Sequence, residues 1–304
     1  MTSTMTSDVT PAAPGRRTRP FYWSVRRELW ENRSVYIAPL IAAGVVLVGV
    51  LVSALHLIHF RVSSQGVSRD ALESLPPDAP YMTAAFVIYV AVLLVGVFYS
   101  LGALHGERRD RSILFWKSLP VSDTTTVLAK AAVPLVVLPV VGFVLIAAVQ
   151  LVILVIGLIS ALVSGQDTAA AGAPVPLLGI IGSELYQLAA TIPWYAPVWG
   201  WLLMVSAWTR HRRPGLWGLG APLAACVLER LALGTSHLAA LIGHRLGDVS
   251  SLAFDHTGHG PGLDFQPPMD PVKFLTSPEL WIGLVVAAAF LAAAVWLRRR
   301  QEPI

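Results

Sequence analysis

The chain has 304 residues, of which 55% are hydrophobic and only 13% are charged, and its formal net charge is +4. A soluble domain usually carries about 25% charged residues, so this composition excludes an ordinary soluble protein and is typical of a membrane protein. The single cysteine, Cys226, excludes an intrachain disulfide.

The N-terminal segment precedes the first apolar run. Residues 1–19 are rich in Ser, Thr and Pro and lack the apolar stretch of a signal peptide, so we expect a disordered tail. Residues 20–34 predict an amphipathic helix that lies flat on the membrane, because aromatic residues and arginines suit the headgroup layer. The alternative is a simple extension of the first span. One face of this helix carries Phe21, Tyr22, Val25 and Leu29, and the opposite face carries Ser24, Arg27, Glu28 and Glu31.

Six apolar segments follow, and all but the third are of about the length that crosses a bilayer. We predict spans at about 36–58, 81–104, 129–163, 185–208, 215–233 and 279–297. The third is long for one straight span and short for two, which predicts a single tilted helix bent near Pro134 and Pro139. Pro193 and Pro197 leave open whether residues 180–208 form one span or a re-entrant piece plus a span. The expected fold is all-α, with a transmembrane domain at 35–300.

The distribution of positive charge sets the orientation. Of the 22 Lys and Arg residues, 17 lie on the side of the membrane that holds both termini, and four lie in the opposite loops. The positive-inside rule therefore puts both termini in the cytoplasm. The longest loop, 234–277, is then outside, and it contains an expected amphipathic helix near His237–Leu246.

The chain contains few motifs that indicate nucleotide binding, metal binding or catalysis. No GxxxxGK[ST] pattern occurs, so the chain has no phosphate-binding loop of its own. His256 and His259 lie close together in the outer loop, but no HExxH pattern accompanies them, and we expect no metal site. Glu229 and Arg230 lie near the end of the fifth span. They are either a polar site inside the membrane or residues at its outer interface.

The most highly charged segment, His105–Lys130, separates the second and third spans. Its first part can continue the second span as a helix until Pro120, because proline disfavours helical geometry in the residue before it. Ser122 is well placed as the N-cap of a new helix, where Asp123 suits the positive helix end. From these residues alone two interpretations stand: an element that docks a partner, or positive charges that only anchor the inner face.

A motif in this segment favours the first interpretation. Glu107-Arg108 follows the second span, residues 114–122 read Leu-Phe-Trp-Lys-Ser-Leu-Pro-Val-Ser, and Lys130 opens the third span. This pattern resembles the first cytoplasmic loop of permease subunits of ABC transporters of the type 2 export class. The six-span layout, the N-terminal interfacial helix and the long outer loop are also similar to that family. The long apolar run after Lys130 departs from the family pattern.

The resemblance implies that a separate ATP-binding subunit binds ATP and Mg and hydrolyses the ATP. This chain would bind no cofactor and would not be an enzyme. It would form the export path in the cell inner (plasma) membrane with a second permease copy or a sister permease, and no nucleic acid is expected as a partner. Residues 20–34 would be the elbow helix and 105–128 the coupling loop. The residues expected to serve coupling to the ATPase are Glu107, Arg108, Arg111, Leu114, Phe115, Trp116, Lys117, Leu119 and Pro120.

Two other classes of function stay open at this point. A membrane-anchored sensor or assembly factor would have no ATPase partner. An intramembrane enzyme that modifies lipids would need ionisable groups that converge within the spans, for which Glu229 and Arg230 are the candidates. The cargo of an exporter is not readable, although the apolar spans favour a hydrophobic or amphipathic molecule.

Overall fold

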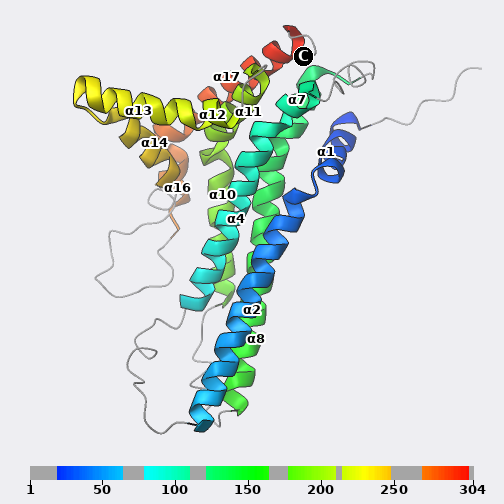
Figure 1. Ribbon diagram of the computed structural model, residues 1–304, viewed down its shortest axis with the longest axis vertical. Helices are drawn as coiled ribbons and strands as arrows, with labels where there is room; N and C mark the ends of the chain where they lie inside the picture. The colour runs from blue at the N-terminus through cyan, green and yellow to red at the C-terminus, as the bar shows by residue number, and fades with distance from the viewer. Residues whose placement is uncertain are drawn as a thin grey trace, which may run out of the picture.

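The protein is described by a computed structural model at residues 19–63, 79–109, 121–163, 177–209, 214–247 and 269–300. Over these residues it is all-helical, and most of the helices form an elongated bundle (Figure 1). Five helices are long and apolar enough to cross a membrane, or up to six when a helix pair bent by 45° counts as one span. These apolar helices indicate a multi-pass membrane protein.

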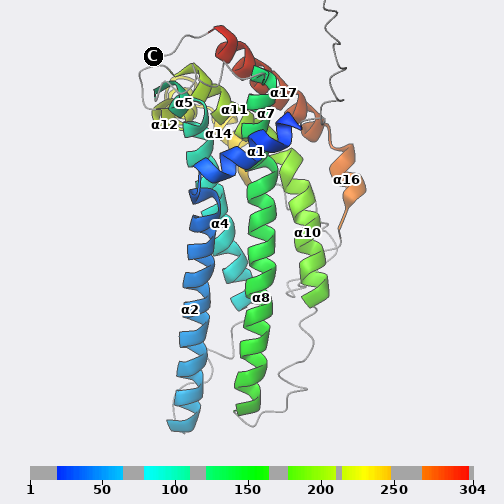
Figure 2. The same cartoon turned by 90° about the vertical axis from the view of Figure 1, so that its right-hand side faces the viewer.

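Helix α1 (Pro20–Glu31) lies across one end of the bundle (Figure 2). Pro20 occupies the first turn, where its missing N–H would have no intrahelical partner. Asn32 ends the helix, and its backbone N–H and its side-chain Nδ2 both donate to the carbonyl oxygen of Glu28. A helix is present within the predicted range, and its placement flat on the membrane stays a prediction. Its polar face, however, turns toward the bundle, whereas aromatic side chains such as Trp23 stay exposed.

Three long helices form one half of the bundle: α2 (Ser34–Ser63), α4 (Ala79–Ala103) and α8 (Leu138–Val163). Their shared core consists mainly of small and branched apolar side chains, including Val35, Ala43, Ala84, Ile88, Val92, Val149 and Ile153. Large apolar side chains also point away from the bundle, and Phe86 and Phe98 are 68% and 71% exposed. Such exposure would be costly in water and is natural against lipid tails.

The third predicted span forms one continuous helical stretch of 38 residues, Asp123–Ser160. It begins with α7 (Asp123–Ala132), passes through a π-helical turn, η1 (Val133–Val137), and continues as α8. Pro134 lies in that turn, and its missing N–H accounts for the local change in hydrogen bonding. The stretch is one long helix, as predicted, and its irregular turn contains Pro134, the first of the two prolines near which a bend was expected.

The other half of the bundle contains a bent helix pair, α10 (Leu177–Trp194) and α11 (Ala196–Trp208), packed on α17 (Pro278–Arg300). The 45° bend falls at Tyr195, where prolines nearby interrupt the helical hydrogen bonds. Helix α11 continues along the bundle in the general direction of α10 (Figure 1). Gly200 lets α11 approach α17 closely, since a Cβ there would lie 3.3 Å from the Ala287 carbonyl oxygen.

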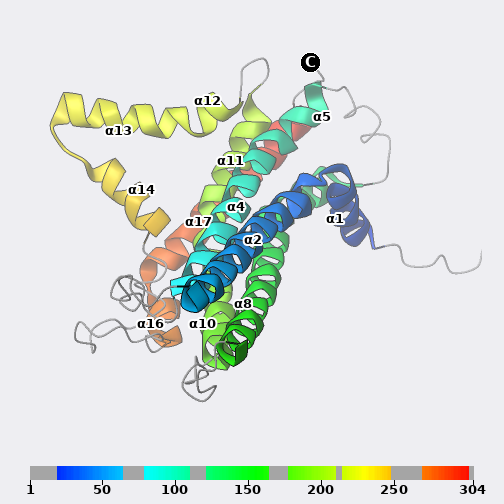
Figure 3. The same ribbon diagram turned by 60° about the horizontal axis from the view of Figure 1, so that its bottom comes forward.

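The fifth predicted span takes a different course from the others. Helices α12 (Pro214–Gly218) and α13 (Gly220–Leu233) run across the bundle axis, as Figure 3 shows. Gly234, with φ of 69°, ends α13 and leads to α14 (His237–Gly247), which confirms the amphipathic helix expected there. No residue of α13 is buried, because its main contacts are with its neighbours α12 and α14. The short α16 (Pro271–Thr276) then leads to α17.

Candidate functional site

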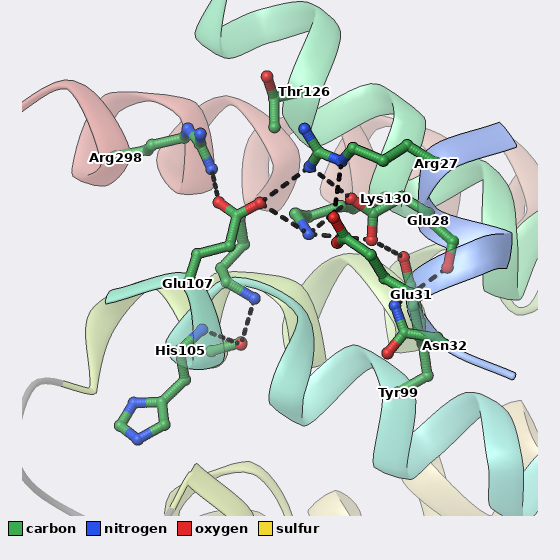
Figure 4. A network of polar contacts seen from close by, with 12 residues as sticks. Arg27, Glu28, Glu31, Asn32, Tyr99, His105, Glu107, Thr126, Lys130 and Arg298 are labelled. Carbon is green, nitrogen blue, oxygen red and sulfur yellow. Dashed lines mark hydrogen bonds and ion pairs between the residues drawn. The ribbon is translucent and has the colours of Figure 1, made fainter. Parts of the chain in front are cut away.

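Charged side chains from four helices meet at the end of the bundle where α1 lies (Figure 4). They come from α1, α5 (His105–Arg109), α7 and α17. We call this group the charged cluster, and its members are Arg27, Glu28, Glu107, Asp123, Lys130 and Arg298. Segments that are far apart in the sequence are therefore joined at one point of the fold.

Lys130 is at the centre of the charged cluster. Its Nζ lies 2.8 Å from Oε1 and 3.0 Å from Oε2 of Glu28, and 3.1 Å from Oε1 of Glu107. The lysine therefore links α1 to α5 through two carboxylates. Glu28 Oε2 also accepts a hydrogen bond of 2.9 Å from the Tyr99 hydroxyl, which brings α4 into the network.

Arg298 extends the charged cluster to the last helix. Its Nη1 lies 2.6 Å from Glu107 Oε2, and its Nε lies 2.9 Å from Asp123 Oδ1. The two oxygens of Glu107 thus face different cations, Lys130 on one side and Arg298 on the other. This carboxylate joins the segment after the second span to both the third span and the last one.

The cluster is buried, and its buried charges balance. Glu28, Glu107, Lys130 and Arg298 are all less than 10% exposed, and they comprise two anions and two cations. Burying a charge costs several kcal/mol unless a partner compensates it, and removing one member of a buried pair typically costs about 3–5 kcal/mol. Each of these groups therefore depends on the presence of the others.

Arg27 lies at the edge of the charged cluster and also contacts Glu31, one turn later on the same helix. Arg27 Nη2 lies 3.0 Å from Glu28 Oε1 and 3.2 Å from Glu107 Oε1, and its Nε lies 3.4 Å from Glu31 Oε1. Partial burial raises the pKa of Glu31 above its ordinary value, and the nearby Arg27 only partly offsets this effect. The Glu31 side chain is 46% exposed, so its contact with Arg27 lies at the surface of the protein.

A serine on α11 positions Glu107. At the junction of α4 and α5, the backbone N–H groups of Leu104 and His105 both donate to Ser206 Oγ at 3.1 Å. The Ser206 hydroxyl in turn donates to the Leu101 carbonyl oxygen at 2.7 Å. Because Ser206 is fully buried, these bonds replace the helical bonds that the junction loses, and they fix the direction of α5.

The N-terminus of α7 positions Lys130 and Asp123. The Ser122 hydroxyl accepts a hydrogen bond of 3.1 Å from the Thr125 backbone N–H, so the N-cap predicted from the sequence is confirmed. Asp123 begins the helix, where its charge suits the positive end of the helix dipole, and it also contacts Arg298. Lys130 follows two turns later, on the buried side of α7.

The residues predicted for coupling fall in two groups. Glu107 lies in the charged cluster, and Arg108 belongs to the same short helix α5. The remaining predicted residues lie outside the described part of the chain: Arg111, Leu114, Phe115, Trp116, Lys117, Leu119 and Pro120. Their contact with an ATPase stays a prediction. The contacts that the structure gives Glu107 are within this chain.

The contacts that the structure describes for Glu229 lie at the turn between α13 and α14, where His237 is an ionisable neighbour. Glu229 accepts hydrogen bonds from the backbone N–H groups of His237 and Leu238, both at 2.8 Å, and from the Thr235 hydroxyl at 2.9 Å. It therefore caps the start of α14. Arg230 is exposed. This arrangement does not favour an intramembrane catalytic site.

Sequence reasoning missed that Glu28, Lys130 and Arg298 belong to one network of buried ion pairs. Glu28 was assigned to the polar face of a surface helix, yet it is only 1% exposed. Its partner Lys130 is 102 residues away, and no periodicity within either helix reveals such a pairing. A usable signal was the position of Lys130, a lone cation at the start of a long apolar run.

Among the residues that the structure describes, no group of three His, Cys, Asp or Glu side chains could hold a metal ion. His256 and His259 lie outside those residues. No family model, no curated protein and no solved structure matches this chain.

Proposed function

We propose that this chain is the membrane-spanning permease subunit of an ATP-driven ABC exporter, coupled to a separate subunit that binds ATP and Mg. The observation that carries the proposal is the charged cluster, which fastens α1, α5, α7 and α17 to one another at one end of the bundle. A subunit that is moved by a partner needs such a rigid joint. Without such a joint, a movement of the partner would displace one loop and would not be transmitted to the membrane-spanning helices.

The placement of the positive residues supports the proposed orientation. Helix α1, helix α5 and the C-terminal end of α17 all lie at the same end of the bundle (Figure 2). Arg298, Arg299 and Arg300 form the last turn of α17. This end would face the cytoplasm of the inner (plasma) membrane under the positive-inside rule, with both termini inside.

The proposed mechanism moves rigid bodies. The ATPase contacts residues after α5, a segment that carries the Trp116 and Lys117 side chains. Its movement passes to Glu107, and from there to α7 through Lys130 and to α17 through Arg298. Because the ion pairs are buried and mutually dependent, the four helices shift together rather than one at a time. Two permease units, either two copies or this chain and a sister permease, would enclose the path.

Co-purification tests the partnership. The Walker-type ATPase that we expect in a neighbouring reading frame is co-expressed with the tagged chain, and the complex is isolated from membranes. We expect the wild-type chain to retain the ATPase and Trp116→Ala to release most of it. The matched control is Trp281→Ala, which removes an exposed tryptophan at the opposite end of α17. Retention by both variants, or the lack of a neighbouring ATPase that binds, would contradict the proposal.

A further inference from the structure

A second polar group lies within the apolar part of the bundle, away from the charged cluster. Gln150 on α8 is completely buried, and its Nε2 donates to Glu184 Oε1 on α10 at 2.5 Å. Gln187 lies three residues after Glu184, so the two share one face of α10. Side chains from two different helices thus form one polar site between membrane-spanning segments.

The unpaired atoms of this site are all hydrogen-bond acceptors. Gln150 Oε1, Glu184 Oε2 and Gln187 Oε1 are buried and have no hydrogen-bond partner among the described residues. Buried polar atoms in proteins are nearly always paired, so these orphaned acceptors on neighbouring faces of α8 and α10 require an explanation. What the site lacks is a donor.

The carboxyl group at the site also has no cationic partner among the described residues. In the charged cluster each buried carboxylate faces a lysine or an arginine, as for Glu107 and Lys130. Glu184, by contrast, forms no ion pair with any residue that the structure describes, and its only contact of this kind is with neutral Gln150. An ionisable residue between membrane helices usually faces a path or a binding cavity. The missing donor is therefore best supplied by a cation.

We propose that Glu184, Gln150 and Gln187 bind the protonated primary amine of an amphipathic ligand. A primary ammonium carries three N–H donors and no acceptor, which matches three unpaired acceptors, one of them on a carboxylate. The ligand's apolar part would lie along the apolar helices around the site. We take this ligand to be the exported cargo, and that step rests on the proposed function. The binding of the amine at this site does not depend on the proposed function.

The test measures binding without the ATPase. The full chain is placed in nanodiscs of neutral phosphatidylcholine, and radiolabelled octylamine and octanol are titrated, with empty nanodiscs subtracted. We expect the wild-type chain to bind octylamine about tenfold or more tightly than octanol, because charge-assisted hydrogen bonds are the stronger ones. Equal affinity for the two probes would overturn the proposal, and this comparison needs no variant.

Variants then locate the site. Glu184→Gln keeps the shape of the side chain and is expected to lower the affinity for octylamine about tenfold, with little effect on octanol. Glu229→Gln, which alters a carboxyl on α13, is the matched control and should bind both probes normally. An unchanged octylamine affinity in Glu184→Gln, or an equal loss for both probes, would overturn the assignment. If the chain does not co-purify with an ATPase but still prefers octylamine, only the proposed function is contradicted.

Discussion

Lys130 and Glu28 form a buried ion pair in which Nζ lies 2.8 and 3.0 Å from the two carboxylate oxygens. The pair joins the N-terminal helix to the third span, and both side chains are almost inaccessible to solvent. Because Glu107 also contacts the same ammonium group, one lysine compensates two buried carboxylates. The stability of this end of the bundle should therefore depend strongly on Lys130.

Replacing Lys130 by methionine should lower the free energy of unfolding by about 3–5 kcal/mol, since it leaves two buried carboxylates without their shared cation. Thermal unfolding of the purified chain, followed by tryptophan fluorescence, measures the effect. Adding Glu28→Gln should recover part of the loss, because a neutral amide no longer needs the ammonium. Lys273→Ala, which truncates an exposed lysine, is the control. A Lys130→Met chain as stable as this control would show that the ion pair is unimportant.

Ser206→Ala should destabilise the junction of α4 and α5. The variant leaves the N–H groups of Leu104 and His105 without their buried acceptor, at a cost of about 1–3 kcal/mol. We expect the rate of hydrogen exchange at these two amides to increase and the melting temperature to decrease. The control is Ser53→Ala, whose hydroxyl bonds an exposed backbone carbonyl within α2. Unchanged exchange at the junction would mean that Ser206 does not hold it.

Gly200→Val tests the close contact of α11 and α17. A Cβ at this position would lie 3.3 Å from both the Ala287 carbonyl oxygen and the Phe290 Cβ, so a branched side chain must force the helices apart. We expect a loss of about 1–3 kcal/mol in the free energy of unfolding. At Gly44 no atom lies within 4 Å of the added Cβ, and Gly44→Val should have little effect. Equal effects of the two substitutions would contradict the packing described.

Much of the local structure follows from the sequence. Apolar length located the membrane-crossing candidates, and Ser122 with Asp123 located the start of α7. The long third span and its irregularity at Pro134 followed from length and proline chemistry. These features depend on residues near one another in the chain, so a local pattern is enough to predict them.

The candidate site was only partly predictable. Glu107 was identified as a site residue, but its pairing with Arg298 connects residues 191 positions apart. Glu184 was overlooked because the fourth span was expected to begin near Leu185, whereas α10 begins at Leu177. The course of α13 across the bundle also escaped prediction, since its apolar length alone indicates a span. Each of these features depends on tertiary contacts that hydropathy does not encode.

The most direct test of coupling through the charged cluster is the ATPase activity of the complex with Glu107→Gln. This variant keeps the side-chain volume but removes the charge that holds both Lys130 and Arg298. We expect that the complex still assembles while its ATP hydrolysis no longer depends on the permease, and that Lys273→Ala behaves as wild type. If ATP hydrolysis in an intact Glu107→Gln complex still depends fully on the permease, coupling through the charged cluster is contradicted.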